Sequence, residues 1–198
     1  PFKSLLRLIG YELFKSRQVL SYDEIYYHLF KNEYKLEQLV VFDVGAHKGE
    51  SVERFKKLFP SSEIHSFEPD PEIFKIIDQN TRKYNSNIKT VYCNNFGLAE
   101  KTDEKIFYRN AKTNTSSFHE VNKESEWAHK RSISRVGDVS KFTTNQLKLK
   151  VDTLDNYMTS NNINNINILK IDTQAFNANV LMGAMEALKK NQIDVIET

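Results

Sequence analysis

The fold is decided by the segment LVVFDVGAHKGES, residues 39–51. Its first six residues are apolar except for Asp43 and rich in β-branched side chains, which is typical of a buried parallel strand. Gly45 and Gly49 follow, and they predict a tight turn in which a bound molecule can approach the backbone. Apolar residues then recur on one helical face at Val52, Phe55, Leu58 and Phe59. We therefore expect a strand, a glycine turn and a helix in succession.

A second strand is predicted at Ile64–Phe67, and Glu68 follows it directly. Strand, glycine turn, helix, strand and acid in this order are typical of half of a nucleotide-binding crevice. Glu68 lies 23 positions after Gly45, close to the ~20 expected for a carboxylate that binds ribose hydroxyls. The alternative is that the two glycines only form a turn, but the acid at the end of the second strand favours a nucleoside ligand.

The turn itself indicates which nucleoside ligand to expect. A dinucleotide site has the pattern G-x-G-x-x-G, whereas Glu50 stands at the third glycine position here. A carboxylate there would repel a pyrophosphate, because both compete for the positive end of the same helix. This disfavours a nicotinamide-dependent oxidoreductase. S-adenosylmethionine carries a ribose and an adenine but no phosphate, and its sulfonium is a cation, so a glycine turn with acids around it suits this molecule.

Four segments together resemble the FkbM family of S-adenosylmethionine-dependent methyltransferases. They are FDVGAHKGE (42–50), SFEPDP (66–71), LKIDTQ (169–174) and VLMGA (180–184). The resemblance covers roughly residues 40–197. It implies an α/β Rossmann-like class I methyltransferase fold, with a mostly parallel, doubly wound sheet and helices on both faces. We expect this domain at residues 39–198, after an N-terminal helical extension at 1–38, and without the last strands of a complete methyltransferase sheet.

The family resemblance implies an O-methyltransferase that uses S-adenosyl-L-methionine and a hydroxyl of a carbohydrate or natural-product acceptor. One motif departs from the family, which usually shows Ile-Asp-x-Glu/Gln-Gly-x-Glu. Here the glycine position is Ala175 and the last acid is Asn177. If that acid serves the chemistry, the chain is a catalytically weak or inactive module that binds S-adenosylmethionine, and this alternative stays open.

The cofactor is expected to contact the first turn and the ends of the next two strands, because ligands of open α/β sheets bind at the carboxyl ends of the strands. The third strand is predicted at residues 88–93, so that Asn95 could bond an adenine edge and Phe96 could pack on its face. The expected cofactor-binding residues are Asp43, Gly45, Ala46, His47, Gly49, Ser51, Glu68, Pro69, Asn95 and Phe96.

Fourth and fifth strands are predicted at Ile168–Ile171 and Ile193–Ile196. Asp172 follows the fourth and is the first candidate for the base that takes the acceptor's proton, with His119 second. Asp172 could instead orient the amino-acid tail of the cofactor or cap the next helix. The weakly patterned segment 110–141 is interpreted as a lid over the acceptor. The residues expected to contact the acceptor are Ser116, Ser117 and Glu197.

Composition limits the remaining possibilities. The chain has 198 residues and a net charge of +2, so charge gives no reason to expect a nucleic-acid partner. Its one cysteine, Cys93, cannot form a disulfide within the chain, which favours a cytoplasmic location. No apolar run is long enough to span a membrane. Residues 2–17 predict an amphipathic helix that packs on the domain or, alternatively, makes a peripheral membrane contact. No spacing of ligand residues predicts a metal site.

Overall fold

In the computed structural model of the chain, the described residues are 21–33, 38–86, 88–120 and 143–198. They fall in two units, Pro1–Leu36 and Glu37–Thr198, and each is described by itself. The amphipathic helix expected at residues 2–17 lies outside the described residues, as does most of the segment interpreted as a lid, from residue 121 onward.

The N-terminal unit contains one described helix, which begins as α2 (Tyr22–Tyr26) and continues as the π-helix η1 (Tyr27–Glu33). Ser21 caps its N-terminus, because the Ser21 hydroxyl accepts a hydrogen bond from the Glu24 backbone N–H, while the Glu24 carboxylate accepts one from the Ser21 N–H. This reciprocal capping box satisfies two backbone donors and fixes the start of the helix.

The second unit is built on a five-stranded sheet in the order β3-β2-β1-β7-β8, and every neighbouring pair in it is parallel. Its strands are β1 (Val40–Val44), β2 (Glu63–Phe67), β3 (Val91–Asn94), β7 (Ile166–Ile171) and β8 (Ile193–Glu197). Along the chain, β1, β2 and β3 are added one after another toward one edge of the sheet. β7 then pairs with β1 on its other side. The order therefore reverses between β1 and β7, and such a switch point opens a crevice at the carboxyl ends of the strands.

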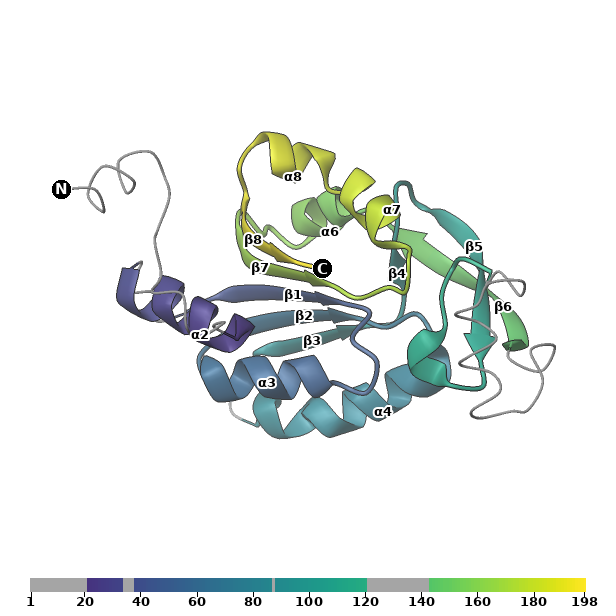
Figure 1. Cartoon of the computed structure of the whole chain (residues 1–198), viewed down its shortest axis with the longest axis horizontal. Helices are drawn as coiled ribbons and strands as arrows, with labels where there is room; N and C mark the ends of the chain where they lie inside the picture. The colour runs from purple at the N-terminus through teal and green to yellow at the C-terminus, as the bar shows by residue number, and fades with distance from the viewer. Residues whose placement is uncertain (1–20, 34–37, 87, 121–142) are drawn as a thin grey trace. The chain divides into compact units, whose positions relative to one another are not determined.

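Helices cover both faces of this sheet (Figure 1). On one face lie α3 (Glu50–Leu58), α4 (Pro71–Thr81) and the 3-10 turn η2 (Arg82–Asn85). On the other face lie α6 (Leu154–Ser160), α7 (Asn177–Met182) and α8 (Met185–Lys189). The predicted α/β fold, with a mostly parallel sheet and helices on both faces, is confirmed.

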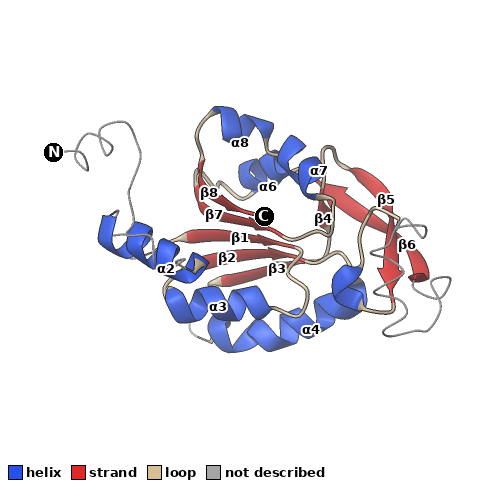
Figure 2. Ribbon diagram, viewed as in Figure 1, coloured by secondary structure: helices blue, strands red, loops and turns tan. Residues whose placement is uncertain are grey.

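A small second sheet, which the sequence did not predict as a separate layer, lies beside the first (Figure 2). It contains β4 (Gly97–Leu98), β5 (Asp103–Asn110) and β6 (Thr143–Asp152) in the order β4-β6-β5. β5 and β6 pair antiparallel along their whole length, whereas β4 runs parallel to β6. The 3-10 turn η3 (Thr113–Thr115) follows β5.

The third strand begins at Val91, three residues later than predicted. The Asn85 side chain explains the difference, because its Oδ1 accepts hydrogen bonds from the backbone N–H groups of Thr90 and Val91, both at 2.9 Å. Ile88, which made the pattern look like a strand, is 76% exposed.

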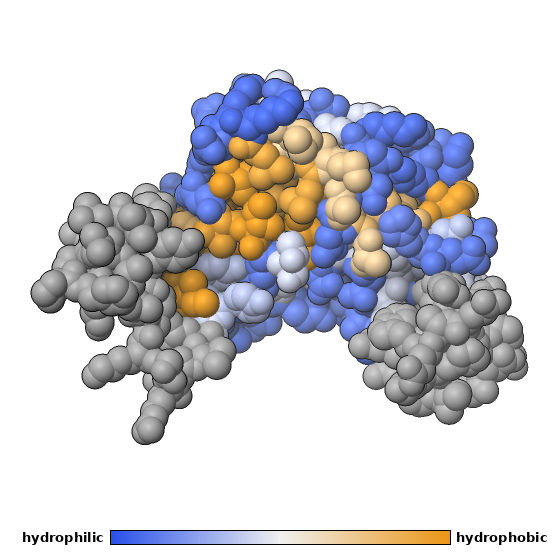
Figure 3. Space-filling view, turned by 45° about the horizontal axis from the view of Figure 1, so that its top comes forward, coloured by the Kyte–Doolittle hydropathy of each residue, from blue (hydrophilic) through white to orange (hydrophobic). Residues whose placement is uncertain are grey.

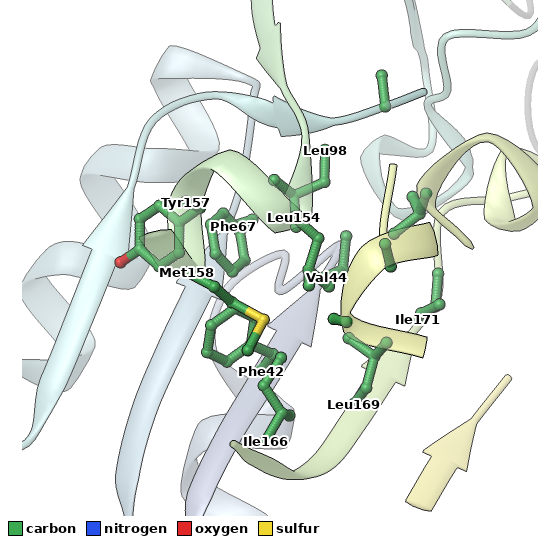
Figure 4. Packing of buried hydrophobic residues seen from close by; sticks show 14 of the residues in the cluster. Phe42, Val44, Phe67, Leu98, Leu154, Tyr157, Met158, Ile166, Leu169 and Ile171 are labelled. Carbon is green, nitrogen blue, oxygen red and sulfur yellow. The ribbon is translucent and has the colours of Figure 1, made fainter. Parts of the chain in front are cut away.

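One hydrophobic cluster of the core lies between the sheet and the helices α6, α7 and α8 (Figure 4). Phe42 and Val44 of β1 point into it and meet Leu154 of α6. Side chains alternate along a strand, so Asp43 faces the opposite side of the sheet, which α3 covers.

At the β8 edge of the sheet, Met185 of α8 and Ile196 of β8 are 45% and 40% exposed. Figure 3 shows hydrophobic residues gathered in a patch on the side of the molecule where α8 and β8 lie. In the parts of the chain that the structure describes, no helix is long and apolar enough to cross a membrane.

Candidate functional site

A pocket opens at the carboxyl ends of β1, β2 and β7, at the switch point of the sheet. Its empty space, part of which is open to solvent, amounts to about 710 Å³. One wall is formed by the turns that follow the three strands, and the other by the segment from Thr113 to Phe118 together with β4 and β5. The polar residues and glycines that line it are Gly45, His47, Glu68, Gly97, Thr113, Asn114, Ser116, Ser117, Asp172, Thr173 and Gln174.

Glu68 lines the pocket from the end of β2, and only 7% of its surface is exposed. Its Oε2 accepts a hydrogen bond from the backbone N–H of His47, and its Oε1 accepts one from that of Asp70, both at 2.9 Å. Burial raises the pKa of Glu68 to about 8, although these two hydrogen bonds oppose the rise. Each oxygen keeps a second lone pair, so the carboxyl group can still accept a hydrogen bond from a ligand.

The turn after β1 depends on its two glycines, and contacts within the protein already require them. Gly45 has φ +81°, and a Cβ there would lie 2.1 Å from the carbonyl oxygen of Asp172. Because Gly45 has no side chain, the backbone that follows β7 can pack directly against this turn. Gly49 has φ +94° and precedes α3, where a Cβ would lie 3.2 Å from Ile77 Cγ1.

His47 connects the two walls of the pocket. Its Nε2 lies 2.9 Å from the Thr113 hydroxyl, and its Nδ1 lies 3.3 Å from Glu50 Oε1. Glu50 is in the first turn of α3, the position at which a dinucleotide site would hold a pyrophosphate. Ala46 and Ser51 belong to the same segment but do not line the pocket.

Asp172 enters the pocket from the end of β7 and is exposed in it. Its backbone N–H donates to the Val44 carbonyl at 2.9 Å, which fixes the start of the loop beside β1. The Gln174 side-chain amide donates to Asp172 Oδ1 at 2.9 Å. Oδ2 has no hydrogen-bond partner among the described residues and can accept a proton. Gln174 stands at the Glu/Gln position of the family motif but was not among the expected site residues, because its contact depends on the left-handed backbone of this loop.

Two successive residues of that loop, Gln174 and Ala175, have φ of +53° and +73°. Such conformations cost energy in residues other than glycine. The loop is held by the Ser117 hydroxyl, which donates to the carbonyls of Thr173 and Gln174 at 3.1 and 2.9 Å. Asn177 holds it from the other side, because its Oδ1 accepts from Thr173 N–H and Oγ1 at 3.2 and 2.6 Å.

The residues expected to contact the acceptor differ in which of their hydrogen-bonding groups remain available. Ser116 lines the pocket, and its Oγ accepts from the Asn110 N–H at 3.0 Å, so its own proton remains free to donate. Ser117 also lines the pocket, but its proton is already shared between two carbonyls. His119 does not line the pocket; its ring packs on Phe176 with 5.0 Å between centroids.

Asp43 and Glu197 lie outside this pocket, so the structure does not give them the contacts expected with cofactor and acceptor. Asp43 is fully buried and pairs with Lys170 Nζ at 3.0 Å. Burial raises the pKa of Asp43, and Lys170 opposes the rise. Glu197 pairs with Arg54 of α3 at 2.6 Å. The physical reason is the alternation of strand residues, which turns these carboxylates toward α3 instead of the pocket.

Asn95 and Phe96 also lie outside the pocket lining. The Asn95 amide donates to the carbonyls of Glu68 and Pro69 at 3.0 and 3.1 Å, so it supports the turn that carries Glu68. The Phe96 ring packs on Phe67 with 5.6 Å between centroids. Both side chains contact the protein, and the contacts with adenine that we expected from them stay a prediction, whereas Pro69 does line the pocket.

The charge of the pocket limits what it can hold. Glu68 and Asp172 are its acids, and none of the described residues that line it is a lysine or arginine. Such a pocket suits a neutral or cationic ligand better than a pyrophosphate. Among the described residues, no group of three or more His, Cys, Asp or Glu side chains could hold a metal ion.

Comparison with known proteins agrees with this geometry. Residues 43–198 match the model of the methyltransferase FkbM domain. No curated protein matches the sequence. Among solved structures, methyltransferase FkbM from Methylobacillus flagellatus KT is similar, with a TM-score of 0.52 and 15% identity over 85% of this chain.

The matched part is 35% of that protein, so the chain spans about a third of its length. At this identity the similarity concerns the fold alone, whereas the family match extends over most of the sequence. The predicted family and the predicted Rossmann-like methyltransferase fold are thus confirmed, and the chain belongs to the FkbM methyltransferase family.

Proposed function

We propose that this chain uses S-adenosyl-L-methionine to methylate a hydroxyl group of a small carbohydrate or natural-product acceptor. The observation that carries the proposal is Glu68, a buried carboxyl group at the end of β2 that lines a pocket without lysine or arginine among its described residues. A carboxylate in this place can accept hydrogen bonds from both hydroxyls of a ribose. When Glu68 is ionised, each such hydrogen bond is worth about 1.5–3 kcal/mol.

The sign of the charge in and beside the pocket supports this methyl donor over a nicotinamide dinucleotide. Asp172 lines the pocket at the end of β7. Glu50, in the first turn of α3, does not line it but contacts His47, which does. These two acids would repel a pyrophosphate, whereas they favour the sulfonium cation and the ammonium group of S-adenosylmethionine. When bound, this cofactor supplies an electrophilic methyl group, and the residues of the chain position the two reactants.

Asp172 is proposed as the general base. An acceptor hydroxyl loses its proton as its oxygen gains the methyl group. Asp172 Oδ2 can take that proton, because no described residue forms a hydrogen bond with this oxygen. Gln174 holds the other carboxylate oxygen at 2.9 Å and thereby limits the rotation of the side chain. Ser116, whose hydroxyl proton remains available, is proposed as a ligand of the acceptor.

Titration calorimetry with S-adenosylhomocysteine and, separately, with NAD tests the cofactor. We expect binding of S-adenosylhomocysteine alone, and at least tenfold weaker binding after Glu68→Ala. Glu104 on β5 provides the matched control, because it lies outside the pocket, and Glu104→Ala should keep the affinity. Binding of NAD instead, or unchanged affinity in a folded Glu68→Ala variant, contradicts the assignment.

A further inference from the structure

Arg109, near the end of β5, forms ion pairs with two acids, Asp70 and Glu72. Its Nε and Nη2 donate to the two carboxylate oxygens of Asp70 at 2.7 and 2.6 Å, and its Nη1 donates to Glu72 Oε1 at 2.8 Å. Asp70 is 2% exposed, and 14% of the Arg109 side chain is exposed. Two parallel hydrogen bonds between a guanidinium and a carboxylate fix direction as well as distance.

On one side, this ion pair fixes the turn that carries Glu68. The Asp70 backbone N–H donates to Glu68 Oε1 at 2.9 Å. Asp70 also caps α4, because its Oδ1 accepts from the Glu72 N–H at 2.9 Å. The same carboxylate that Arg109 binds is therefore tied to the helix and, through its own backbone, to the Glu68 carboxyl group.

On the other side, the two neighbours of Arg109 hold the opposite wall of the pocket. Tyr108 exchanges backbone hydrogen bonds with Ser117, at 2.8 and 3.2 Å. The Asn110 backbone N–H donates to Ser116 Oγ at 3.0 Å, and the Asn110 amide donates to the Thr115 carbonyl at 2.7 Å. Any displacement of this part of β5 would move the pocket-lining serines with it.

We propose that Arg109 is a positioning residue for the ligand: by binding Asp70 it holds the two walls of the pocket together and keeps Glu68 where it can receive the ribose. This rests on the proposed function. The sequence patterns did not single out Arg109 or Asp70 for any role in the site, and neither residue lines the pocket.

The charges around Glu68 give the arrangement a second effect. Besides burial, the neighbouring carboxylates of Asp70 and Asp43 raise the pKa of Glu68, while the backbone N–H groups of Asp70 and His47 lower it. Arg109 is the cation bound to Asp70. Without it, the negative charge of Asp70 would be uncompensated, and Glu68 would be harder to ionise.

Arg109→Met removes the ion pair and keeps most of the side-chain volume. We expect S-adenosylhomocysteine to bind at least tenfold more weakly at pH 7, with a smaller loss at pH 9, where Glu68 can ionise. Arg109→Met/Asp70→Asn should regain only the pH-dependent part of the affinity, because asparagine still caps the helix and carries no charge but cannot restore the link between the two walls. Lys148→Met is the control, since Lys148 forms an exposed ion pair with Glu104 in the same sheet.

Calorimetry with S-adenosylhomocysteine at several pH values, together with circular dichroism to verify folding, decides the result. Wild-type affinity in folded Arg109→Met at every pH overturns the proposal, as does a folded double variant with full wild-type affinity, because that variant also lacks the ion pair that is proposed to hold the walls together. If Arg109→Met does not fold, Arg109→Lys replaces it, and unchanged affinity in that variant overturns the proposal because lysine cannot bind both oxygens in a planar fork. A wild-type protein that binds no S-adenosylhomocysteine contradicts the proposed function first and the role of Arg109 with it.

Discussion

Replacing Glu68 with glutamine should change how the stability of the free protein depends on pH. The pKa of Glu68 is raised from 4.5 to about 8, chiefly by burial. The folded state therefore binds the proton more tightly than the unfolded state does. The stability that protonated Glu68 contributes is fully present below pH 4.5 and is lost as the pH rises through 8.

The size of this loss follows from the rise in pKa. Each unit of difference corresponds to roughly 1.4 kcal/mol, so a rise from 4.5 to about 8 lowers the free energy of unfolding by about 4–5 kcal/mol between acidic and alkaline pH. Only 7% of Glu68 is exposed, so solvent screens little of this effect. Such a loss is a large part of the ~5–15 kcal/mol that stabilises an ordinary domain.

Glutamine carries a different cost, which does not depend on pH. Glu68 accepts one hydrogen bond on each oxygen, from His47 N–H and Asp70 N–H, but glutamine has one carbonyl oxygen and places its NH₂ group against the second donor. A buried donor without a partner costs about 1–3 kcal/mol. Glu68→Gln should therefore be less stable than wild type at pH 5 and more stable above pH 8.5, with the two curves crossing at about pH 5–7, where wild type has lost the same ~1–3 kcal/mol.

Urea unfolding at a series of pH values from 5 to 9 measures both curves. Glu104→Gln is the control, because Glu104 is an exposed carboxylate on β5 and its replacement should leave the wild-type dependence unchanged. If wild type and Glu68→Gln give parallel curves over this range, Glu68 does not titrate between pH 5 and 9 and the reasoning from burial is wrong.

Three further changes test the framework of the pocket by urea unfolding, and a fourth tests its chemistry. Gly45→Ala should lower the free energy of unfolding by more than about 2 kcal/mol. The left-handed backbone conformation costs a non-glycine residue ~1–2 kcal/mol, and the new Cβ would also clash with the Asp172 carbonyl. Ala175→Gly should gain roughly 0.5–1 kcal/mol, since φ is +73° there and glycine adopts this conformation freely. Lys170→Met should lower the free energy of unfolding by about 3–5 kcal/mol, because it leaves the buried Asp43 unpaired. The loss should be smaller when Asp43→Asn accompanies it. Asp172→Asn should slow methyl transfer by ~10²–10⁴-fold while the calorimetric affinity for S-adenosylhomocysteine stays within a few-fold.

The parts of the fold that could be predicted from the sequence are those that depend on local order. The apolar run at residues 39–44, the glycine turn and the helix after it are contiguous, and the structure has all three. Glu68 could be placed in the pocket because it follows a strand directly, and the residue after a parallel strand lies at the edge where ligands bind.

Residues one or two positions from such an edge could not be placed in the same way. Asp43 and Glu197 lie within β1 and β8, so the pleat of the strand, and not nearness to its end, decides which way they point. The small sheet was missed because β5 and β6 are separated by more than thirty residues in sequence, and a pattern of alternating residues does not reveal its partner. Arg109 was missed for a similar reason, since Asp70 lies far from it in the sequence.

The two departures from the family motif take on a different meaning in the structure. Ala175 and Asn177 do not line the pocket, whereas Asp172, Thr173 and Gln174 between β7 and α7 do. Asn177 holds the loop through its two hydrogen bonds from Thr173, and Ala175 adopts the left-handed conformation in which glycine is favoured. The substitutions therefore alter how the loop is held and leave the groups that face the pocket in place. This favours an enzyme with a differently supported loop over a module that has lost its catalytic group.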